Sequence, residues 1–221
     1  FVPLKMRWLV SILLLLASIF IGVKIYDGIM EPINFDIDKK VKYAAVIKNL
    51  KIIRDAEVAH YEVAGKYTKN KAALIQFIDT AKFAITEARD TVVRVDRGGG
   101  ITEEVSRKKI DTIGYEPVLA RFKGKDYKNM FKVPGHEGKE FDLEIGSVEK
   151  VAGLHVPVFE AKTDKETILK GMNPSLLKLE LEAIATDQIK GQYISVGSLE
   201  EITTGGNWPP SYDKPSDKKD N

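Results

Sequence analysis

The hydrophobic and polar positions of the 221-residue chain form three successive patterns: an apolar run, a helical period and short alternating segments. The apolar run extends from Trp8 to Val23 without a charged residue. From Asp38 to Ala64, apolar residues recur at helical spacing, which predicts an amphipathic helix. Beyond Phe83 the apolar segments are short and rich in β-branched residues, as is typical of strands. The pattern therefore predicts an α+β protein with an N-terminal transmembrane helix, a long amphipathic stalk helix and a small antiparallel-sheet head.

The apolar run is long enough to cross a membrane. With Ile25 and Tyr26 added and Lys24 snorkelling, the span covers residues 8–26, close to the ~20 residues that a spanning helix needs. Trp8 and Tyr26 stand at its two ends, where aromatic side chains favour the membrane interface. A cleaved signal peptide is the alternative, although its apolar region is shorter as a rule. The residues expected to contact lipid are Trp8, Leu13, Leu14, Leu15, Leu16, Phe20 and Tyr26.

Charges on the two sides of this span predict its orientation. Lys5 and Arg7 precede it, whereas Lys24 is followed by acidic residues. The positive-inside rule then places residues 1–7 in the cytoplasm. We expect a single-pass inner-membrane protein with a periplasmic C-terminal domain, and the lipid bilayer as its first partner.

A linker and a stalk are expected after the span. Gly28 and Pro32 predict a break, so residues 27–37 are assigned to a linker. The stalk and the head together occupy residues 38–209, with Asp38 as the expected N-cap of the stalk and Gly65 as its C′ residue. Small and apolar side chains form one face of the stalk, which is expected to pack on the head or on a partner helix: Val41, Ala45, Ile52, Ala56 and Ala59.

The end of the stalk carries a resemblance to a known family. Residues 53–67 end in Gly-Lys-Tyr67, and Asn70 then caps a short helix with Leu74 and Ile75. Together with the N-terminal span, this stretch resembles the first helix of type IV pilins and type II secretion pseudopilins. The resemblance covers residues 8–78 and implies a membrane-anchored helix within a secretion or pilus-like assembly. An ordinary helical hairpin is the alternative interpretation of the same residues.

The chain departs from that family at two places. Pilins carry a glutamate at the fifth position of the mature chain, inside the apolar stretch, whereas this chain has Lys5 before the stretch. Pilins also continue the span directly into the stalk helix, whereas Pro32 follows the span here. The layout is also similar to that of single-anchor envelope proteins of diderm bacteria, a resemblance that implies no activity.

The head is expected to contain short strands and helices. A turn is expected at residues 87–90, and Pro157 restricts its strand to an edge or to pairing on one side. Thr163 and Asn173 are expected to open helices, and residues 210–221 to form a disordered tail. The expected strands are residues 83–86, 91–95, 110–114, 141–148, 154–161 and 193–196.

Little in the sequence points to catalysis. The chain has no cysteine, and His60, His136 and His155 are too far apart to resemble a metal motif. Beyond the span, acidic and basic residues nearly balance, which disfavours a nucleic-acid partner. A cluster of basic residues interleaved with aromatics is interpreted as a solvated face whose aromatic side chains point inward. Its members are Arg121, Phe122, Lys123, Lys125, Tyr127, Lys128, Phe131 and Lys132.

We therefore expect a non-enzymatic structural subunit or adaptor of a bacterial envelope assembly, with no catalytic, metal or cofactor-binding residues. Its expected partners are other subunits of that complex, with a homo-oligomer left open. A periplasmic ligand-binding or sensory module is the main alternative, and its first pocket candidates are Phe122, Tyr127 and Phe131. A membrane-anchored hydrolase is a third, which would require histidine and acidic side chains to converge.

Overall fold

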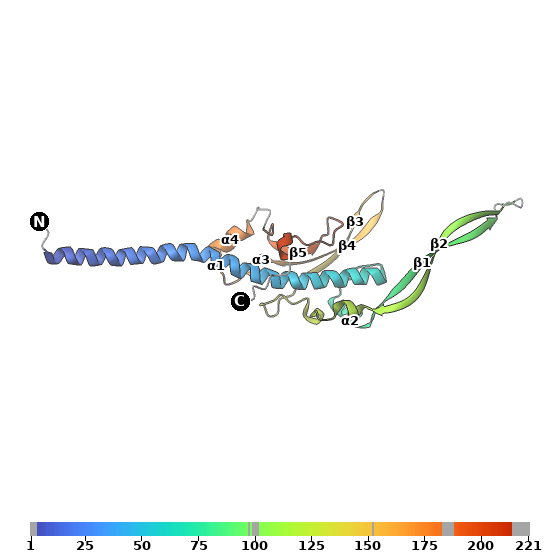
Figure 1. The fold of residues 1–221 in the computed structure, drawn as a ribbon, viewed down its shortest axis with the longest axis horizontal. Helices are drawn as coiled ribbons and strands as arrows, with labels where there is room; N and C mark the ends of the chain where they lie inside the picture. Colours follow the sequence, from blue (N-terminus) through green and yellow to red (C-terminus); the bar gives the residue numbers. More distant parts are fainter. Residues whose placement is uncertain (1–3, 97, 99–101, 152, 183–187, 214–221) are drawn as a thin grey trace.

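The computed structural model describes residues 4–96, 98, 102–151, 153–182 and 188–213 (Figure 1). It has the expected α+β architecture. One long N-terminal helix, α1 (Leu4–Ala64), runs from the apolar segment into a head that contains small antiparallel sheets. Within the described residues, α1 is the one helix that is long and apolar enough to cross a membrane.

Helix α1 is continuous through the expected linker. Pro32 lies inside the helix, and Asp38, the expected N-cap, is an interior residue. A proline inside a helix removes one backbone hydrogen bond and costs about 3 kcal/mol or more. Tertiary contacts hold the helix on both sides of Pro32, because Asn173 donates a hydrogen bond to Glu31 over 2.6 Å and Phe35 is buried. The assignment of residues 27–37 to a break was therefore wrong.

The C-terminal end of α1 follows the sequence signals. Gly65 adopts a φ of 70°, a conformation that suits glycine, and its N–H donates to the Tyr61 carbonyl. Helix α2 (Lys71–Thr80) then begins at the expected N-cap, where the Asn70 side chain accepts a hydrogen bond from the Ala73 N–H. Leu74 on α2 is fully buried, so α2 packs back onto α1.

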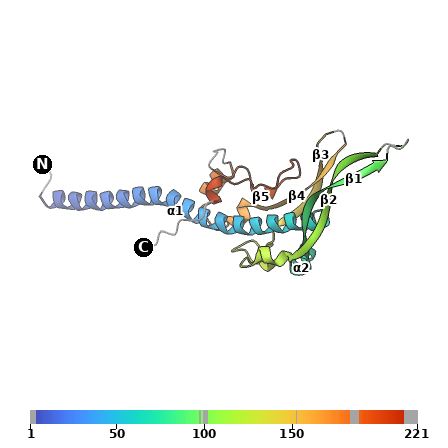
Figure 2. The same cartoon turned by 45° about the vertical axis from the view of Figure 1, so that its right-hand side comes forward.

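A three-stranded antiparallel sheet covers another side of α1 (Figures 1 and 2). Its order is β3 (Asp142–Glu149), β4 (His155–Asp164) and β5 (Tyr193–Gly197). The hairpin expected from the alternating pattern is present. On one side, Pro157 of β4 pairs with Ser147 of β3. On the other side, β4 pairs with β5 only from Glu160 onwards. Pro157 is thus paired on one side, as its missing N–H requires.

The short helices α3 (Lys165–Ile168) and α4 (Pro174–Leu181) connect β4 to β5. Asp164, rather than Thr163, caps α3 by accepting from the Thr167 N–H, so the capping signal was displaced by one residue. Asn173 caps α4 as expected. The last described element is a 3₁₀ turn at Pro210–Tyr212, a segment that had been assigned to the disordered tail. The rest of that tail, residues 214–221, lies outside the described residues.

A long two-stranded arm, built from β1 (Lys82–Asp96) and β2 (Thr102–Pro117), projects beyond the far end of α1 (Figures 1 and 2). The turn expected at residues 87–90 is wrong, because these residues lie in the middle of β1. Asp90 there is opposite Lys108, so a cross-strand partner of opposite charge accommodates a residue that otherwise favours turns. The pairing of the two strands extends to Asp96 and Thr102, and Gly98 between them has a φ of 87°.

The hydrophobic core surrounds the C-terminal half of α1. Tyr43, Leu50 and Ile53 from α1 are almost completely buried, and the two sides of the head close over them. Two 3₁₀ segments, Val118–Phe122 and Tyr127–Asn129, complete the side that carries α2. Other core residues are Val46, Ile47, Leu74, Ile78, Phe122, Met130, Phe141, Phe159, Ile194 and Val196.

Candidate functional site

The most prominent surface feature is an apolar row on α1 outside the span. Ile29, Ile33, Ile37 and Val41 follow one another at intervals of four and are 57%, 45%, 55% and 67% exposed. This spacing places them along one side of the helix. The head packs on another side, through residues such as Tyr43. The row continues the exposed apolar surface of residues 8–26 along the helix, so it is a candidate contact surface.

The stalk face predicted from the sequence is divided by the structure. Val41 is exposed and belongs to the apolar row, and Ala45 is half-buried. Ile52, Ala56 and Ala59 are buried at 4%, 0% and 2% exposure, inside the core of the same chain. Of the two uses considered for this face, those three residues serve the packing of α1 on its own head. Val41 alone is available to a partner.

The predicted lipid-contacting residues lie on a bare stretch of α1. Trp8, Leu13 and Phe20 are 69%, 68% and 63% exposed, and the head does not reach them. Leu14, Leu15, Leu16 and Tyr26 are exposed to a similar degree. Such an apolar stretch is costly in water and favourable in a bilayer.

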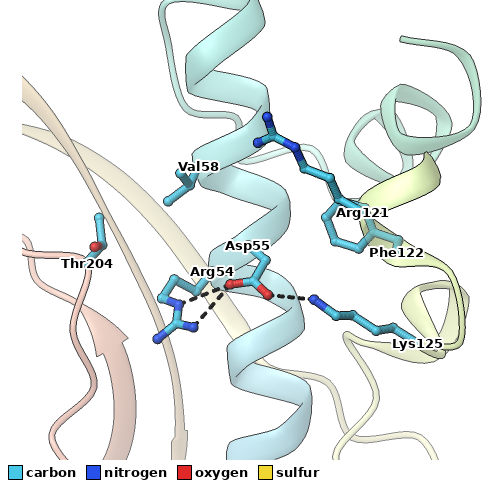
Figure 3. A pocket seen from close by; sticks show the side chains of 7 residues that line it. All are labelled: Arg54, Asp55, Val58, Arg121, Phe122, Lys125 and Thr204. Carbon is cyan, nitrogen blue, oxygen red and sulfur yellow. Dashed lines mark hydrogen bonds and ion pairs between the residues drawn. The ribbon is translucent and has the colours of Figure 1, made fainter. Parts of the chain in front are cut away.

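A hollow of about 390 Å³ lies beside α1 (Figure 3), and its lining residues are Arg54, Asp55, Val58, Arg121, Phe122, Lys125 and Thr204. The Asp55 carboxylate accepts hydrogen bonds from two of these cations, at 3.1–3.2 Å from Arg54 and 2.8 Å from Lys125. Arg121 pairs with Glu62 at 2.8 Å and stacks on the Phe83 ring. Charges that are satisfied in this way hold the 3₁₀ segments against α1.

The aromatic pocket candidates lie mainly in the packed interior of the head. Phe122 and Phe131 are buried in the core, and only Phe122 also lines the hollow beside α1. Tyr127 is half-buried and donates a hydrogen bond of 2.5 Å to Asp79. These positions do not favour the ligand-binding alternative.

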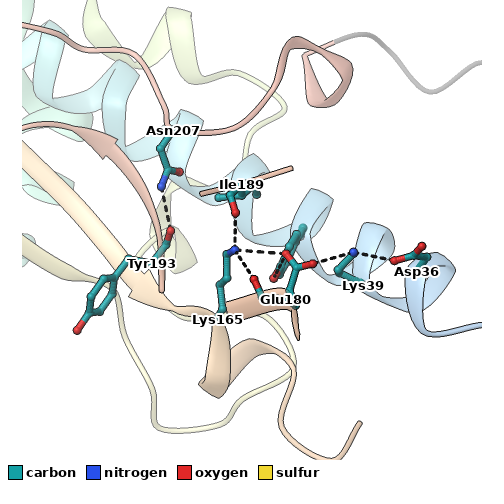
Figure 4. Close-up of polar contacts among 8 residues, drawn as sticks. Asp36, Lys39, Lys165, Glu180, Ile189, Tyr193 and Asn207 are labelled. Atoms are coloured by element: carbon teal, nitrogen blue, oxygen red, sulfur yellow. Dashed lines mark hydrogen bonds and ion pairs between the residues drawn. The ribbon is translucent and has the colours of Figure 1, made fainter. Parts of the chain in front are cut away.

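A buried set of charges joins α1 to α3 and α4 (Figure 4). The Glu180 carboxylate lies between two ammonium groups, Lys39 at 2.9 Å and Lys165 at 3.3 Å. Asp36 also binds Lys39, at 2.7 Å, and the Tyr43 hydroxyl donates to Glu180. Two acids and two lysines therefore form a neutral set.

Lys39, Lys165 and Glu180 are shielded from water, whereas the side chain of Asp36 is 58% exposed. Lys165 is 0% exposed, and its ammonium also donates to the carbonyls of Glu180 and Ile189. Burial lowers the pKa of Lys165, and the nearby Glu180 opposes that change. Burial also lowers the pKa of Lys39, but hydrogen bonds to Asp36 and Glu180 outweigh it and leave that pKa raised. Each ion depends on its partners, so the set is a structural joint between the stalk and the head.

Histidines do not converge in the structure. His60 Nδ1 lies 2.6 Å from the Lys66 carbonyl, and His136 Nε2 lies 3.2 Å from the Ile168 carbonyl. His155 lies at the start of β4. Among the described residues, no group of three or more histidines and carboxylates is placed to hold a metal ion.

Glu57 of α1 is a buried acid at the contact between the stalk helix and the head. Its side chain is 0% exposed; the Thr68 N–H donates to Oε2, whereas Oε1 has no hydrogen-bond partner. Burial raises the pKa of Glu57 to about 7, and the Thr68 hydrogen bond opposes this only in part. The carboxyl group is therefore a latent source of pH dependence in stability.

We expect Glu57→Gln to stabilise the protein at pH 8. The raised pKa means that the folded protein keeps a proton which the unfolded chain releases, so stability falls between pH 4.5 and about 7. Removing the charge should raise the free energy of unfolding by about 3 kcal/mol at pH 8 and leave it almost unchanged below pH 4.5. Urea unfolding at both pH values measures this difference. Asp38→Asn, at an exposed acid of the same helix, is the control, and an equal gain in both variants would contradict the prediction.

Comparison of this chain with models of protein families, with curated proteins and with solved structures finds no match.

Sequence reasoning missed two of these features. Glu180 and Lys39 are separated by 141 positions, and neither one has a local pattern that marks it as buried. The apolar row was partly visible, since Ile33 and Ile37 continue the period of four to Val41. The expected linker at residues 27–37 concealed it, because a break would have removed the common helical face.

Proposed function

We propose that this protein is a non-enzymatic structural subunit or adaptor of a multi-protein bacterial envelope assembly, of the secretion or pilus-like class. In this proposal the inner membrane holds residues 8–26, and the head lies in the periplasm. Lys5 and Arg7 support the orientation through the positive-inside rule. Partners of the protein are the other subunits of the assembly.

The observation that carries the proposal is the apolar row of α1. Ile29, Ile33, Ile37 and Val41 are exposed on a helix that the head itself holds in place. Branched aliphatic side chains at one face, next to a membrane span, suit contact with another helix that rises from the same membrane. The paired charges beside Asp55 serve packing within the chain, which leaves the row as the favoured contact.

Purification from native membranes tests this proposal. The tagged full-length protein is isolated in a mild detergent and its companions are quantified by mass spectrometry, beside Ile37→Glu and a second glutamate variant as the control. The control is Gly28→Glu rather than a change at Asn34, because Asn34 lies three residues from Ile37 and seven from Val41, on the same side of the helix. Gly28 is exposed on the opposite side of α1, and an added side chain there meets no neighbouring atom. Loss of at least 1.4 kcal/mol of binding should reduce recovery about tenfold for Ile37→Glu alone. Recovery of the wild type without companions would show the proposal to be wrong.

A further inference from the structure

The arm offers unpaired strand edges to its surroundings. Within the described residues its sheet consists of β1 and β2 alone, so the outer edge of each strand lacks a neighbouring strand. A two-stranded ribbon is only marginally stable in water, and this one extends about 50 Å. Its surface also carries apolar side chains, with Val92 and Ile110 at 60% and 68% exposure. Such an edge is a template for a further strand.

We propose that this further strand comes from a second copy of the protein. The outer edge of β2 in one copy pairs with the outer edge of β1 in the next copy, in the same register that β1 and β2 have within one chain. The two arms together then form a four-stranded antiparallel sheet.

Anchoring in one membrane selects this pair of edges. Strands β1 and β2 run in opposite directions, so β2 can pair antiparallel with β1 of a copy whose arm points the same way. Both α1 helices then start from the same side. Antiparallel pairing of β2 with β2 would instead turn the two arms, and with them the two anchors, in opposite directions. This step rests on the membrane anchoring in the proposed function.

The charges of one arm face fit this arrangement. Arg94 lies opposite Glu104 with an ion pair at 3.0 Å, and Asp90 lies opposite Lys108. In the four-stranded sheet, Glu104 of the first copy also meets Arg94 of the second, and Lys108 of the first meets Asp90 of the second. Each row of four then alternates in sign, which favours cross-strand pairing. Between the rows, Ser106 of the first copy meets Val92 of the second.

The other face is compatible with the same register. There Glu87 lies opposite Asp111 and Arg89 opposite Lys109, so each row carries one sign. Ion pairs along each strand offset the repulsion between these like charges, with Arg89 to Glu87 at 2.7 Å and Lys109 to Asp111 at 3.2 Å. Nearer the tip, the opposed residues Val93 and Val105 extend a β-branched row across both copies.

Sheet twist limits the number of copies. Neighbouring strands rotate by roughly 20–25°, so a copy two strands away is turned by about 45°. Two anchored helices can share this rotation, since spanning helices commonly tilt by about 20°. A third copy would be turned by about 90° from the first, beyond the range of such tilts. The proposed assembly is therefore a pair.

Disulfide cross-linking in membranes tests the pairing directly, because the chain has no cysteine of its own. Full-length Ser106→Cys and Val92→Cys proteins carry different tags, are expressed together and are oxidised in the membrane. Both positions are exposed, so the fold should tolerate the changes. Ala84→Cys, on the same strand and face as Val92, replaces it in the control. It lies eight residues away, about 27 Å along the strand, whereas a disulfide needs Cα atoms within roughly 7 Å.

The expected result is a mixed Ser106–Val92 dimer, at least about tenfold more abundant than the Ser106–Ala84 product. A dimer of Ser106→Cys alone would show two β2 strands paired instead and would overturn the like-oriented arrangement. Equal products in the two mixtures would indicate random collision and would also overturn it. So would the absence of any product when both cysteines react with a maleimide.

This experiment separates the arm from the proposed function. Cross-linking without other companions in the native purification would leave the pair intact and would contradict the adaptor. Recovery of companions without any cross-link would support the adaptor and contradict the pairing of the arms. The two surfaces lie on different elements, the row on α1 and the edges on β1 and β2, so Ile37→Glu should leave the cross-link unchanged.

Discussion

Replacing Glu180 with alanine should destabilise the head by about 3–5 kcal/mol, the usual cost of removing one member of a buried ion pair. The change leaves Lys165, which is fully buried, without its counter-ion, and Lys39 with Asp36 alone. Lys165 is 0% exposed, so its ammonium cannot reach water without opening the contacts around it. The loss should therefore exceed that of an ordinary surface ion pair several-fold.

Urea unfolding of the full chain in detergent measures this effect through Trp208, which is 8% exposed, in a Trp8→Phe background that removes the other tryptophan. Glu182→Ala changes an exposed acid two residues away and should alter stability by no more than about 0.5 kcal/mol. A loss below about 1 kcal/mol for Glu180→Ala would mean that water already reaches the lysines. The description of Lys39, Lys165 and Glu180 as shielded from water would then be wrong.

Ile52→Glu should destabilise the protein strongly and Val41→Glu hardly at all, although both residues belong to the stalk face predicted from the sequence. Ile52 is 4% exposed and Val41 67%. A carboxylate at Ile52 would be buried among core side chains without a partner, at a cost above about 4 kcal/mol. At Val41 it stays in water, so stability should change by about 0.5 kcal/mol or less.

The same urea titration distinguishes the two variants, with circular dichroism to report whether Ile52→Glu folds at all. Ile52→Val provides a milder companion, with an expected loss of about 0.5–1.5 kcal/mol. If Ile52→Glu is as stable as the wild type, α1 is not packed in the head as described. Loss of partners in a variant with Ile52→Glu would in any case reflect unfolding, so contact with partners is tested at Ile37.

Local rules predicted the elements whose cause is local. Asn70 and Asn173 cap helices because each needs only its own side chain and the next three residues. The alternating pattern of the β3–β4 hairpin and the restriction at Pro157 are likewise written into short segments.

Other features depend on distant partners. Pro32 signals a break locally, but contacts from Asn173 and around Phe35 hold the helix together. Asp90 favours turns in isolation, but Lys108 opposite it accommodates a strand. The charge set around Glu180 joins segments that are far apart in sequence, so no local window contains it. A single sequence also leaves open whether Ile52 faces its own head or a partner, because helical periodicity identifies an apolar face without its occupant.

The uninterrupted course of α1 makes the protein a lever. A flexible linker at residues 27–37 would allow the head to reorient independently of residues 8–26. A helix of 61 residues instead fixes the height of the head and transmits rotation along about 90 Å. A change of about 10° in the tilt of the span would displace the far end of the helix by roughly 16 Å. In the membrane arrangement proposed above, small rearrangements of the span would therefore produce large displacements of the arm.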